Sequence, residues 1–142
     1  MGDKNPKAYQ TRRMTFSACH RLNSPFLSAI ENENTYGKCN HINGHGHNYT
    51  VKVTLFGEIH PQTGMIMNMT DLKKNMQEAI MKPLDHKNLD ADVEYFKLNP
   101  STTENLTVFI WRQMKQVMEK PELLYEVEVH ETENNIVSYR GD

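Results

Sequence analysis

The chain has few cysteines, no long apolar run and almost no excess of charge. Its two cysteines, among 142 residues, are too few to indicate a disulfide framework. No apolar segment approaches the roughly 20 residues that cross a bilayer, which excludes a membrane protein. Basic residues number 16 and acidic residues 18, a balance of −2 that argues against nucleic acid as a partner. The amino terminus lacks an apolar signal core, so we expect a cytoplasmic protein.

The composition, 37% hydrophobic and 24% charged, is typical of a folded domain. We expect a flexible tail over residues 1–8 and a single domain over residues 9–142. Helices are predicted over residues 70–81, ended by Pro83, and from a capping box of Ser101 and Glu104 onward. Periodicity and turn signals predict strands over residues 9–20, 48–59, 124–131 and 136–139. This order is typical of an α+β fold, with a four-stranded, mostly antiparallel sheet and both helices on one face.

Two features of this arrangement bear on function. The sheet face without helices would be uncovered although the strands are rich in apolar residues, so we expect packing against further copies of the chain. About 25 residues rich in Asn, Ser, Pro and Gly connect the first two strands, and a loop of that length is usually functional or flexible.

Three histidines form a candidate metal site. His45 and His47 lie two residues apart where the second strand begins, so both side chains project from one face. If the first two strands pair as a hairpin, His20 lies beside them, and the glycines at positions 44 and 46 leave room. Neutral imidazole is a common zinc ligand, and a catalytic zinc takes three protein ligands and keeps one position open.

Other polar residues have alternative interpretations. Cys39 is either a fourth ligand of a closed, structural zinc site or a free thiol for acid–base or nucleophilic chemistry. Asp85 and His86 form either a proton relay or part of a solvated loop. Glu131 ends the third strand, where it is either a solvated acid or an acceptor for a guanidine-like edge. Cys19 is expected to be a small buried residue.

Four motifs in this order resemble the 6-pyruvoyl-tetrahydropterin synthase family, in its animal form. The resemblance covers residues 9–140, nearly the whole chain. The residues that carry it are Cys39-x5-His45-Gly46-His47-Asn48-Tyr49, Pro83-Leu84-Asp85-His86-Lys87-Asn88-Leu89-Asp90, Ser101-Thr102-Thr103-Glu104-Asn105 and Glu131-Thr132-x-Asn134-Asn135.

The resemblance implies a fold, an assembly and an activity. The fold is the tunnelling fold, in which the sheets of three subunits join into a barrel and two trimers stack as a homohexamer. The activity is that of a lyase in tetrahydrobiopterin biosynthesis. It converts 7,8-dihydroneopterin triphosphate to 6-pyruvoyl-tetrahydropterin and eliminates triphosphate.

The resemblance also implies roles for particular residues. One zinc ion per subunit would be held by His20, His45 and His47. The pterin would be anchored by Glu131, with Thr102 and Thr103 beside it. Cys39 would be the general base, and Asp85 and His86, from a neighbouring subunit, would complete the proton relay.

Some points stay open at this level. His41 and Ile42 stand beside the base where the family more often has Asn and Pro, and we expect this departure to tune the activity. Lys38 and Arg21 are candidates for triphosphate binding, and it is open whether Mg²⁺ assists. The alternatives are 6-carboxy-tetrahydropterin synthase of queuosine biosynthesis and a zinc- or pterin-binding module without catalysis.

Overall fold

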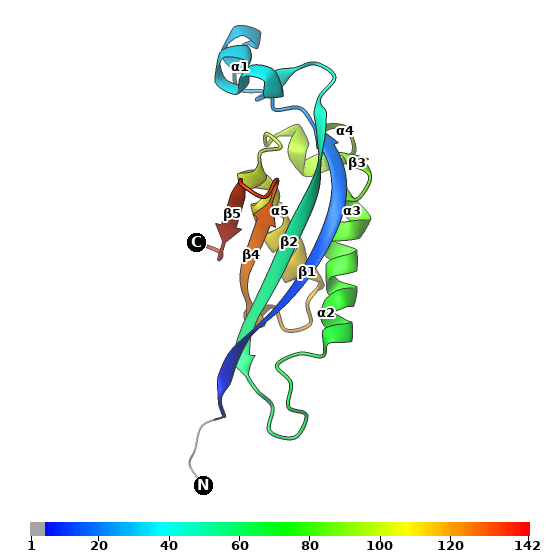
Figure 1. Cartoon of the computed structure of the whole chain (residues 1–142), viewed down its shortest axis with the longest axis vertical. Helices are drawn as coiled ribbons and strands as arrows, with labels where there is room; N and C mark the ends of the chain where they lie inside the picture. Colours follow the sequence, from blue (N-terminus) through cyan, green and yellow to red (C-terminus); the bar gives the residue numbers. More distant parts are fainter. Residues whose placement is uncertain (1–4) are drawn as a thin grey trace.

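A single twisted sheet organises the chain (Figure 1), and the computed structural model describes residues 5–142. The strand order is β3-β1-β2-β4-β5, antiparallel throughout except for β3, which pairs in parallel with β1. The predicted α+β fold is therefore confirmed, with a fifth strand added. That strand has two residues, too few for any alternation that a sequence could reveal. The strands are β1 (Lys7–His20), β2 (His45–Glu58), β3 (Lys87–Asn88), β4 (Leu124–His130) and β5 (Ile136–Tyr139).

The first two strands are longer than predicted. β1 begins at Lys7, inside the expected tail, and β2 begins at His45 rather than at residue 48. Residues 1–4 of that tail lie outside the described part of the chain. Because β1 and β2 pair along their whole length, the extra residues at each end gain ladder hydrogen bonds that the sequence pattern does not show.

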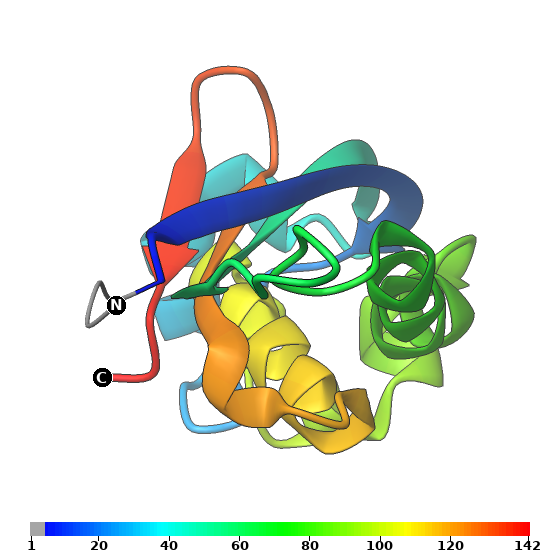
Figure 2. The same ribbon diagram turned by 90° about the horizontal axis from the view of Figure 1, so that it is seen from below.

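Both long helical segments cover the same face of the sheet (Figure 2). One is α5 (Thr103–Val117). The other is continuous through α2 (Met69–Met76), the π-helical turn η2 (Gln77–Met81) and α3 (Lys82–Leu84). Among residues 5–142, none of the helices combines the length and the apolarity that crossing a membrane requires.

The prediction that Pro83 ends the first helix was wrong, because the helix continues to Leu84. A proline normally clashes with the carbonyl group four residues earlier. Here the turn just before it is widened, and the Lys82 N–H donates to the Gln77 carbonyl five residues back. The wider turn accommodates the ring, and the chain leaves the helix at Asp85, whose backbone is extended.

The start of α5 also differs from the prediction by one residue. Thr102, not Ser101, is the N-cap, and its hydroxyl accepts a hydrogen bond from the Asn105 N–H. Ser101 is fully buried, and its hydroxyl donates to Asp90 instead. Two adjacent hydroxyl residues offer the same capping signal, and a tertiary contact decides which of them caps the helix.

The core lies between the sheet and these helices. It takes the apolar residues of β2, which alternate along the strand and are fully buried: Tyr49, Val51, Val53 and Leu55. The opposite face of the sheet carries the intervening polar residues, such as Thr50, Lys52 and Thr54. The expectation of a largely apolar open face was therefore wrong, because period-two alternation puts the apolar side chains on the helix side.

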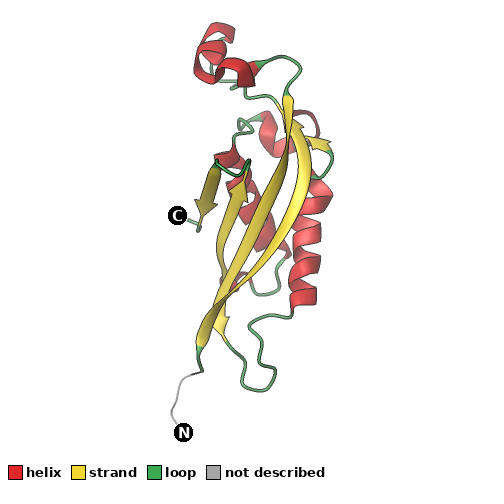
Figure 3. Ribbon diagram, viewed as in Figure 1, coloured by secondary structure: helices red, strands yellow, loops and turns green. Residues whose placement is uncertain are grey.

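The long connection after β1 has structure of its own (Figure 3). It contains α1 (Ala29–Tyr36) and the 3-10 helix η1 (Gly37–Asn40), which project beyond the end of the sheet. A capping box of Ser28 and Glu31 starts α1, with both reciprocal hydrogen bonds present. That spacing was the overlooked sequence signal. The remaining short helices are α4 (Leu89–Asp92), η3 (Glu94–Lys97) and η4 (Pro121–Leu123).

Candidate metal centre and active site

The three histidines meet where β1 ends and β2 begins. His20 lies opposite His45 in the antiparallel register, and His47 lies two residues further along β2. The predicted hairpin is thus confirmed. Ligating nitrogens of the three rings lie within 4.8 Å of one another, and the Nε2 atoms of His20 and His45 are 3.1 Å apart. A cluster of this size is suited to hold one metal ion.

The hydrogen bonds and burial of these rings suit metal binding. His20 is 1% exposed, and its burial lowers its pKa below the usual range. Its Nδ1 lies 2.7 Å from the Ser101 carbonyl oxygen. A carbonyl only accepts, so Nδ1 carries the proton and Nε2 presents a lone pair to the centre.

His47 is the second ring whose surroundings fit a metal. Burial lowers its pKa, against the opposing effect of the Glu131 carboxylate, so a neutral ring is favoured. Its Nε2 is buried and has no hydrogen-bond partner, because the nearest acid oxygen, from Glu131, is 3.8 Å away. A buried nitrogen without a partner is costly, and a metal ion at this point would satisfy it.

The two glycines beside the histidines are not equivalent. Gly44 has a φ of +70°, and a Cβ there would lie 2.7 Å from the His20 carbonyl oxygen. A Cβ at Gly46 would meet only ordinary contacts, the nearest at 3.5 Å. The prediction that glycine leaves room is therefore confirmed for Gly44, where the chain turns into β2 against the end of β1.

Glu131 lies directly after β4 and beside the histidines. Its Oε2 accepts a hydrogen bond from the Thr103 hydroxyl at 2.6 Å, and Oε1 faces His47. This carboxylate is held in place and mostly buried, which disfavours the alternative of a solvated acid. Thr102, in contrast, uses its hydroxyl to cap α5. The structure thus brings Thr103, and not the Thr102 hydroxyl, to the carboxylate.

Cys39 lies in η1, and its thiol is free and partly exposed. Its carbonyl oxygen accepts from the Leu22 N–H, which ties η1 to the chain just after His20. Within residues 5–142, the cluster of metal-ligating side chains contains the three histidines without Cys39. This arrangement favours a free thiol over a fourth ligand.

Asp85 and His86 lie at the outer edge of β1. The Asp85 carboxylate accepts from the Ser17 N–H at 3.0 Å and pairs with His86 Nδ1 at 2.8 Å. The Ser17 N–H is the main reason that the Asp85 pKa falls below its usual range. His86 has a φ of 59°, unusual for a residue other than glycine, and its ring is exposed. Residues 5–142 of one chain show no hydrogen bond between this pair and Cys39.

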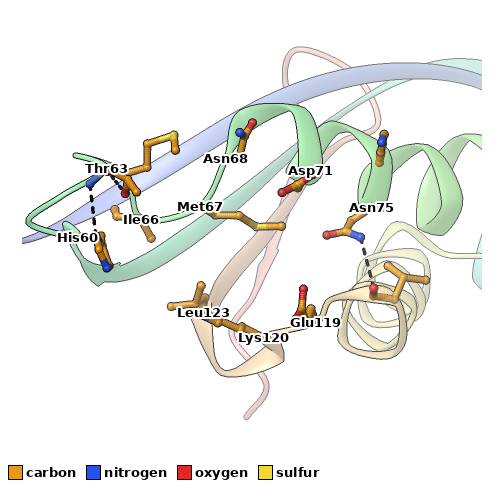
Figure 4. Close-up of a pocket in the computed structure, with 13 residues that line it drawn as sticks. His60, Thr63, Ile66, Met67, Asn68, Asp71, Asn75, Glu119, Lys120 and Leu123 are labelled. Atoms are coloured by element: carbon orange, nitrogen blue, oxygen red, sulfur yellow. Dashed lines mark hydrogen bonds between the residues drawn. The ribbon is translucent and has the colours of Figure 1, made fainter.

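Two of the hollows on the surface differ in their relation to the predicted site residues. One, of about 450 Å³, lies at the edge of β1 and is lined by Cys19, Asn48 and His86 among others. Cys19 is exposed here, and the prediction that it is buried was wrong, because it points to the open face of β1. A larger cavity of about 530 Å³ lies under the start of α2, where Asn75 donates to the Val117 carbonyl (Figure 4). None of the predicted site residues lines it.

Three histidines positioned for a metal, with a fixed carboxylate beside them, are typical of a metal-assisted enzyme rather than of a structural metal site. Comparison with known proteins specifies the class further. The profile of the family described as 6-pyruvoyl tetrahydropterin synthase matches residues 9–142. The chain is 60% identical over 138 residues to the Drosophila melanogaster 6-pyruvoyl tetrahydrobiopterin synthase, covering 97% of this chain and 82% of that protein.

A human relative and a solved structure agree with this match. The Homo sapiens 6-pyruvoyl tetrahydrobiopterin synthase is 57% identical over 141 residues, covering 99% of this chain and 97% of that protein. The structure of Caenorhabditis elegans 6-pyruvoyl tetrahydropterin synthase superposes with a TM-score of 0.96 at 46% identity and covers 99% of both chains. The chain belongs to the 6-pyruvoyl tetrahydropterin synthase family. It is a lyase of tetrahydrobiopterin biosynthesis, as its motifs predicted.

Proposed function

We propose that the chain converts 7,8-dihydroneopterin triphosphate to 6-pyruvoyl tetrahydropterin and releases triphosphate, with zinc held by His20, His45 and His47. The observation that carries this proposal is the cluster of three imidazoles, one with a buried and unpartnered nitrogen, beside a fixed carboxylate. Zinc bound there would polarise hydroxyl groups of the substrate side chain and so acidify the adjacent C–H.

The protein's own residues bind and orient the substrate. In this proposal, the Glu131 carboxylate accepts hydrogen bonds from the 2-amino group and N3–H of the pterin, a bidentate arrangement that fixes the ring plane. Thr103 supports it, because its hydroxyl already holds one of the two carboxylate oxygens. Thr102 acts indirectly in this proposal, because it caps the N-terminus of α5, the end of the helix that faces the substrate. The side chain of the substrate then extends from the pterin toward the histidines.

Proton transfer in this proposal uses Cys39, Asp85 and His86. The Cys39 thiolate takes a proton from the side-chain carbon, and a neighbouring protonated imidazole stabilises a thiolate. Asp85 orients the His86 ring through Nδ1 and leaves Nε2 free to exchange a proton. Since Cys39 and His86 do not meet within the described part of one chain, we propose that they pair across two subunits.

The edges and the exposed apolar residues of the sheet support such an assembly. Among residues 5–142, β3 covers β1 only at Ala18 and Cys19, so most of the outer edge of β1 is unpaired, as is the outer edge of β5. The region of α1 and η1 exposes Phe26, Ile30 and Ile42, each more than 70% accessible. We propose that β1 and β5 edges join three subunits into a barrel and that two such trimers form a homohexamer, a cytoplasmic enzyme.

Product analysis tests this function. Purified protein, either zinc-loaded or stripped with a chelator, is incubated with 7,8-dihydroneopterin triphosphate, with and without Mg²⁺, and the products are identified by mass spectrometry. We expect triphosphate and a 6-pyruvoyl product from the zinc-loaded protein only. A 6-carboxy product would indicate the alternative synthase of queuosine biosynthesis. No turnover by a folded, zinc-loaded oligomer would indicate a binding protein.

A further inference from the structure

A closed ring of hydrogen bonds surrounds the buried ligand His20. The Asp90 carboxylate accepts from the backbone N–H of Arg21 at 2.6 Å through Oδ2 and from the Ser101 hydroxyl at 2.7 Å through Oδ1. The Ser101 carbonyl oxygen accepts from His20 Nδ1 at 2.7 Å. The peptide bond between His20 and Arg21 completes the ring. One carboxylate therefore fixes both the backbone and the side chain of His20.

Burial stabilises this one arrangement of hydrogen bonds over alternatives. Ser101 is 0% exposed and His20 is 1% exposed, so water does not replace a broken bond at either of them. Ser101 belongs to the connection between η3 and α5, which has no regular structure of its own. The hydroxyl bond to Asp90 holds Ser101 beside His20, in addition to the bond that Asn105 donates to the Pro100 carbonyl. Asp90 itself lies in α4, which Asn88 caps by accepting from two backbone N–H groups.

We propose that Asp90 is a positioning residue for the metal centre. Through its bonds to Ser101 and Arg21, Asp90 holds His20 in the Nδ1–H form with Nε2 turned to the centre. This inference rests on the proposed zinc function. A metal-ligating histidine needs its other nitrogen bonded to an acceptor, because that bond sets the tautomer and the ring orientation. Here the acceptor is the backbone carbonyl of Ser101, and the Asp90 carboxylate holds this residue through the Ser101 hydroxyl.

The same carboxylate is linked to the turn that carries Cys39. The Arg21 guanidinium donates through Nε to the Asn40 carbonyl oxygen at 2.8 Å. Arg21 is therefore engaged in the protein itself, which weakens its candidacy as a ligand for triphosphate. Because Asp90 holds the Arg21 backbone and Arg21 holds the residue after Cys39, the ring also connects the histidine centre with the proposed base.

Zinc affinity of matched variants tests this inference. Asp90→Ala removes both bonds of the carboxylate, and Ser101→Ala removes only the second. Asp92→Ala is the control, because Asp92 lies in the same helix and its carboxylate also accepts from one backbone N–H, that of Asn88, without reaching the ring. Circular dichroism checks that each variant is folded at the temperature of the measurement.

We expect the zinc dissociation constant to rise about 10- to 100-fold in Asp90→Ala and to stay within about twofold in Asp92→Ala. The double variant of Asp90 and Ser101 is expected to bind no more weakly than Asp90→Ala, because both changes open the same ring. Equal zinc affinity in Asp90→Ala and Asp92→Ala would overturn the inference.

A second readout needs neither metal nor activity. In zinc-free protein, the proton on His20 Nδ1 should give a slowly exchanging imidazole N–H signal in the NMR spectrum. We expect that signal in the wild-type chain and in Asp92→Ala, and its loss in folded Asp90→Ala. If the wild-type chain bound no zinc, the proposed function would fail, and this signal alone would decide whether Asp90 positions His20. Its persistence in Asp90→Ala would refute the proposal.

Discussion

At the scale of single residues, the site separates groups that are held rigidly from groups that are left free. The His20 ring is buried and bonded, and Glu131 is fixed by Thr103. The Cys39 thiol and the outer nitrogen of His86 make no hydrogen bond among the described residues, which suits groups that exchange protons. The histidine cluster was predictable, because two strands and a register suffice to bring the rings together. The role of Asp90 was not, because its partner Arg21 is 69 positions away along the chain.

Cys39→Ala tests the proposed base. We expect turnover to fall by at least about 100-fold, the usual contribution of an acid–base group, while zinc affinity stays unchanged because the thiol is outside the histidine cluster. Cys19→Ala is the matched control, since that thiol is exposed on the open face of β1. Steady-state kinetics and zinc titration of both variants give the comparison. A Cys39→Ala enzyme with wild-type turnover would refute the assignment.

The depressed pKa of Asp85 predicts that the free energy of unfolding depends on pH. Its pKa is depressed in the folded chain, mainly by the Ser17 N–H, whereas in the unfolded chain an aspartate titrates near about 3.9. The unfolded state therefore takes up the proton first, and the stabilisation is present above about pH 4 and is lost as the pH falls below it. We expect Asp85→Asn to cost about 1 kcal/mol at pH 7 and to reduce the loss of stability on acidification.

Denaturant unfolding at several pH values measures this difference. The wild-type curve and the Asp85→Asn curve should converge as the pH falls through the range below 4. Parallel curves over the whole range would mean that the Ser17 contact does not depend on the charge of Asp85.

At the scale of elements, the β1–β2 hairpin creates the site, and its register was set by apolar alternation on one face. The positions of four strands and of the two long helices were predicted from periodicity and turn signals. The exact ends did not, because they depend on tertiary contacts: a widened turn accommodates Pro83, and Asp90 takes the hydroxyl of Ser101 away from capping. The helix α1 was predictable from its capping box, although its short, weakly apolar sequence hides it.

Gly44→Ala tests the entry into β2. A Cβ at Gly44 would overlap the His20 carbonyl oxygen, and a φ of +70° strains any residue with a Cβ. We expect a loss of about 2 kcal/mol or more in the free energy of unfolding, together with weaker zinc binding. Gly46→Ala, whose Cβ meets only ordinary contacts, should stay within about 0.5 kcal/mol of the wild type. Equal stability of the two variants would contradict this explanation of Gly44.

At the scale of the whole molecule, a single chain brings the three histidines together but keeps the proposed acid–base groups apart among residues 5–142. The pair of Asp85 and His86 faces outward at the edge of β1, while Cys39 lies in η1 at the end of the hairpin. Association was predicted from an apolar open face, and this reason was wrong, since the open sheet face is mostly polar. Among residues 5–142, the strand edges without a partner and the exposed apolar residues near α1 support the proposed assembly instead.

Subunit mixing tests the shared site. Sedimentation should give a mass six times that of the 16.5 kDa chain. Cys39→Ala and His86→Ala should each be inactive alone. When the two are unfolded together and refolded as mixed oligomers, about a quarter of the sites should combine an intact Cys39 with an intact His86 from a neighbour. A monomeric mass, or no recovered activity in verified mixed oligomers, would contradict a site built from two subunits.

The most direct single measurement is a zinc titration of chelator-stripped protein, in parallel with a His45→Ala variant, while triphosphate release is followed. We predict that turnover is absent without metal, rises in proportion to zinc and reaches its plateau at one ion per chain, and that His45→Ala recovers little activity at the same zinc concentration. Full turnover by the stripped wild-type enzyme, or by His45→Ala without bound zinc, would show that the three histidines are not the metal centre of the reaction.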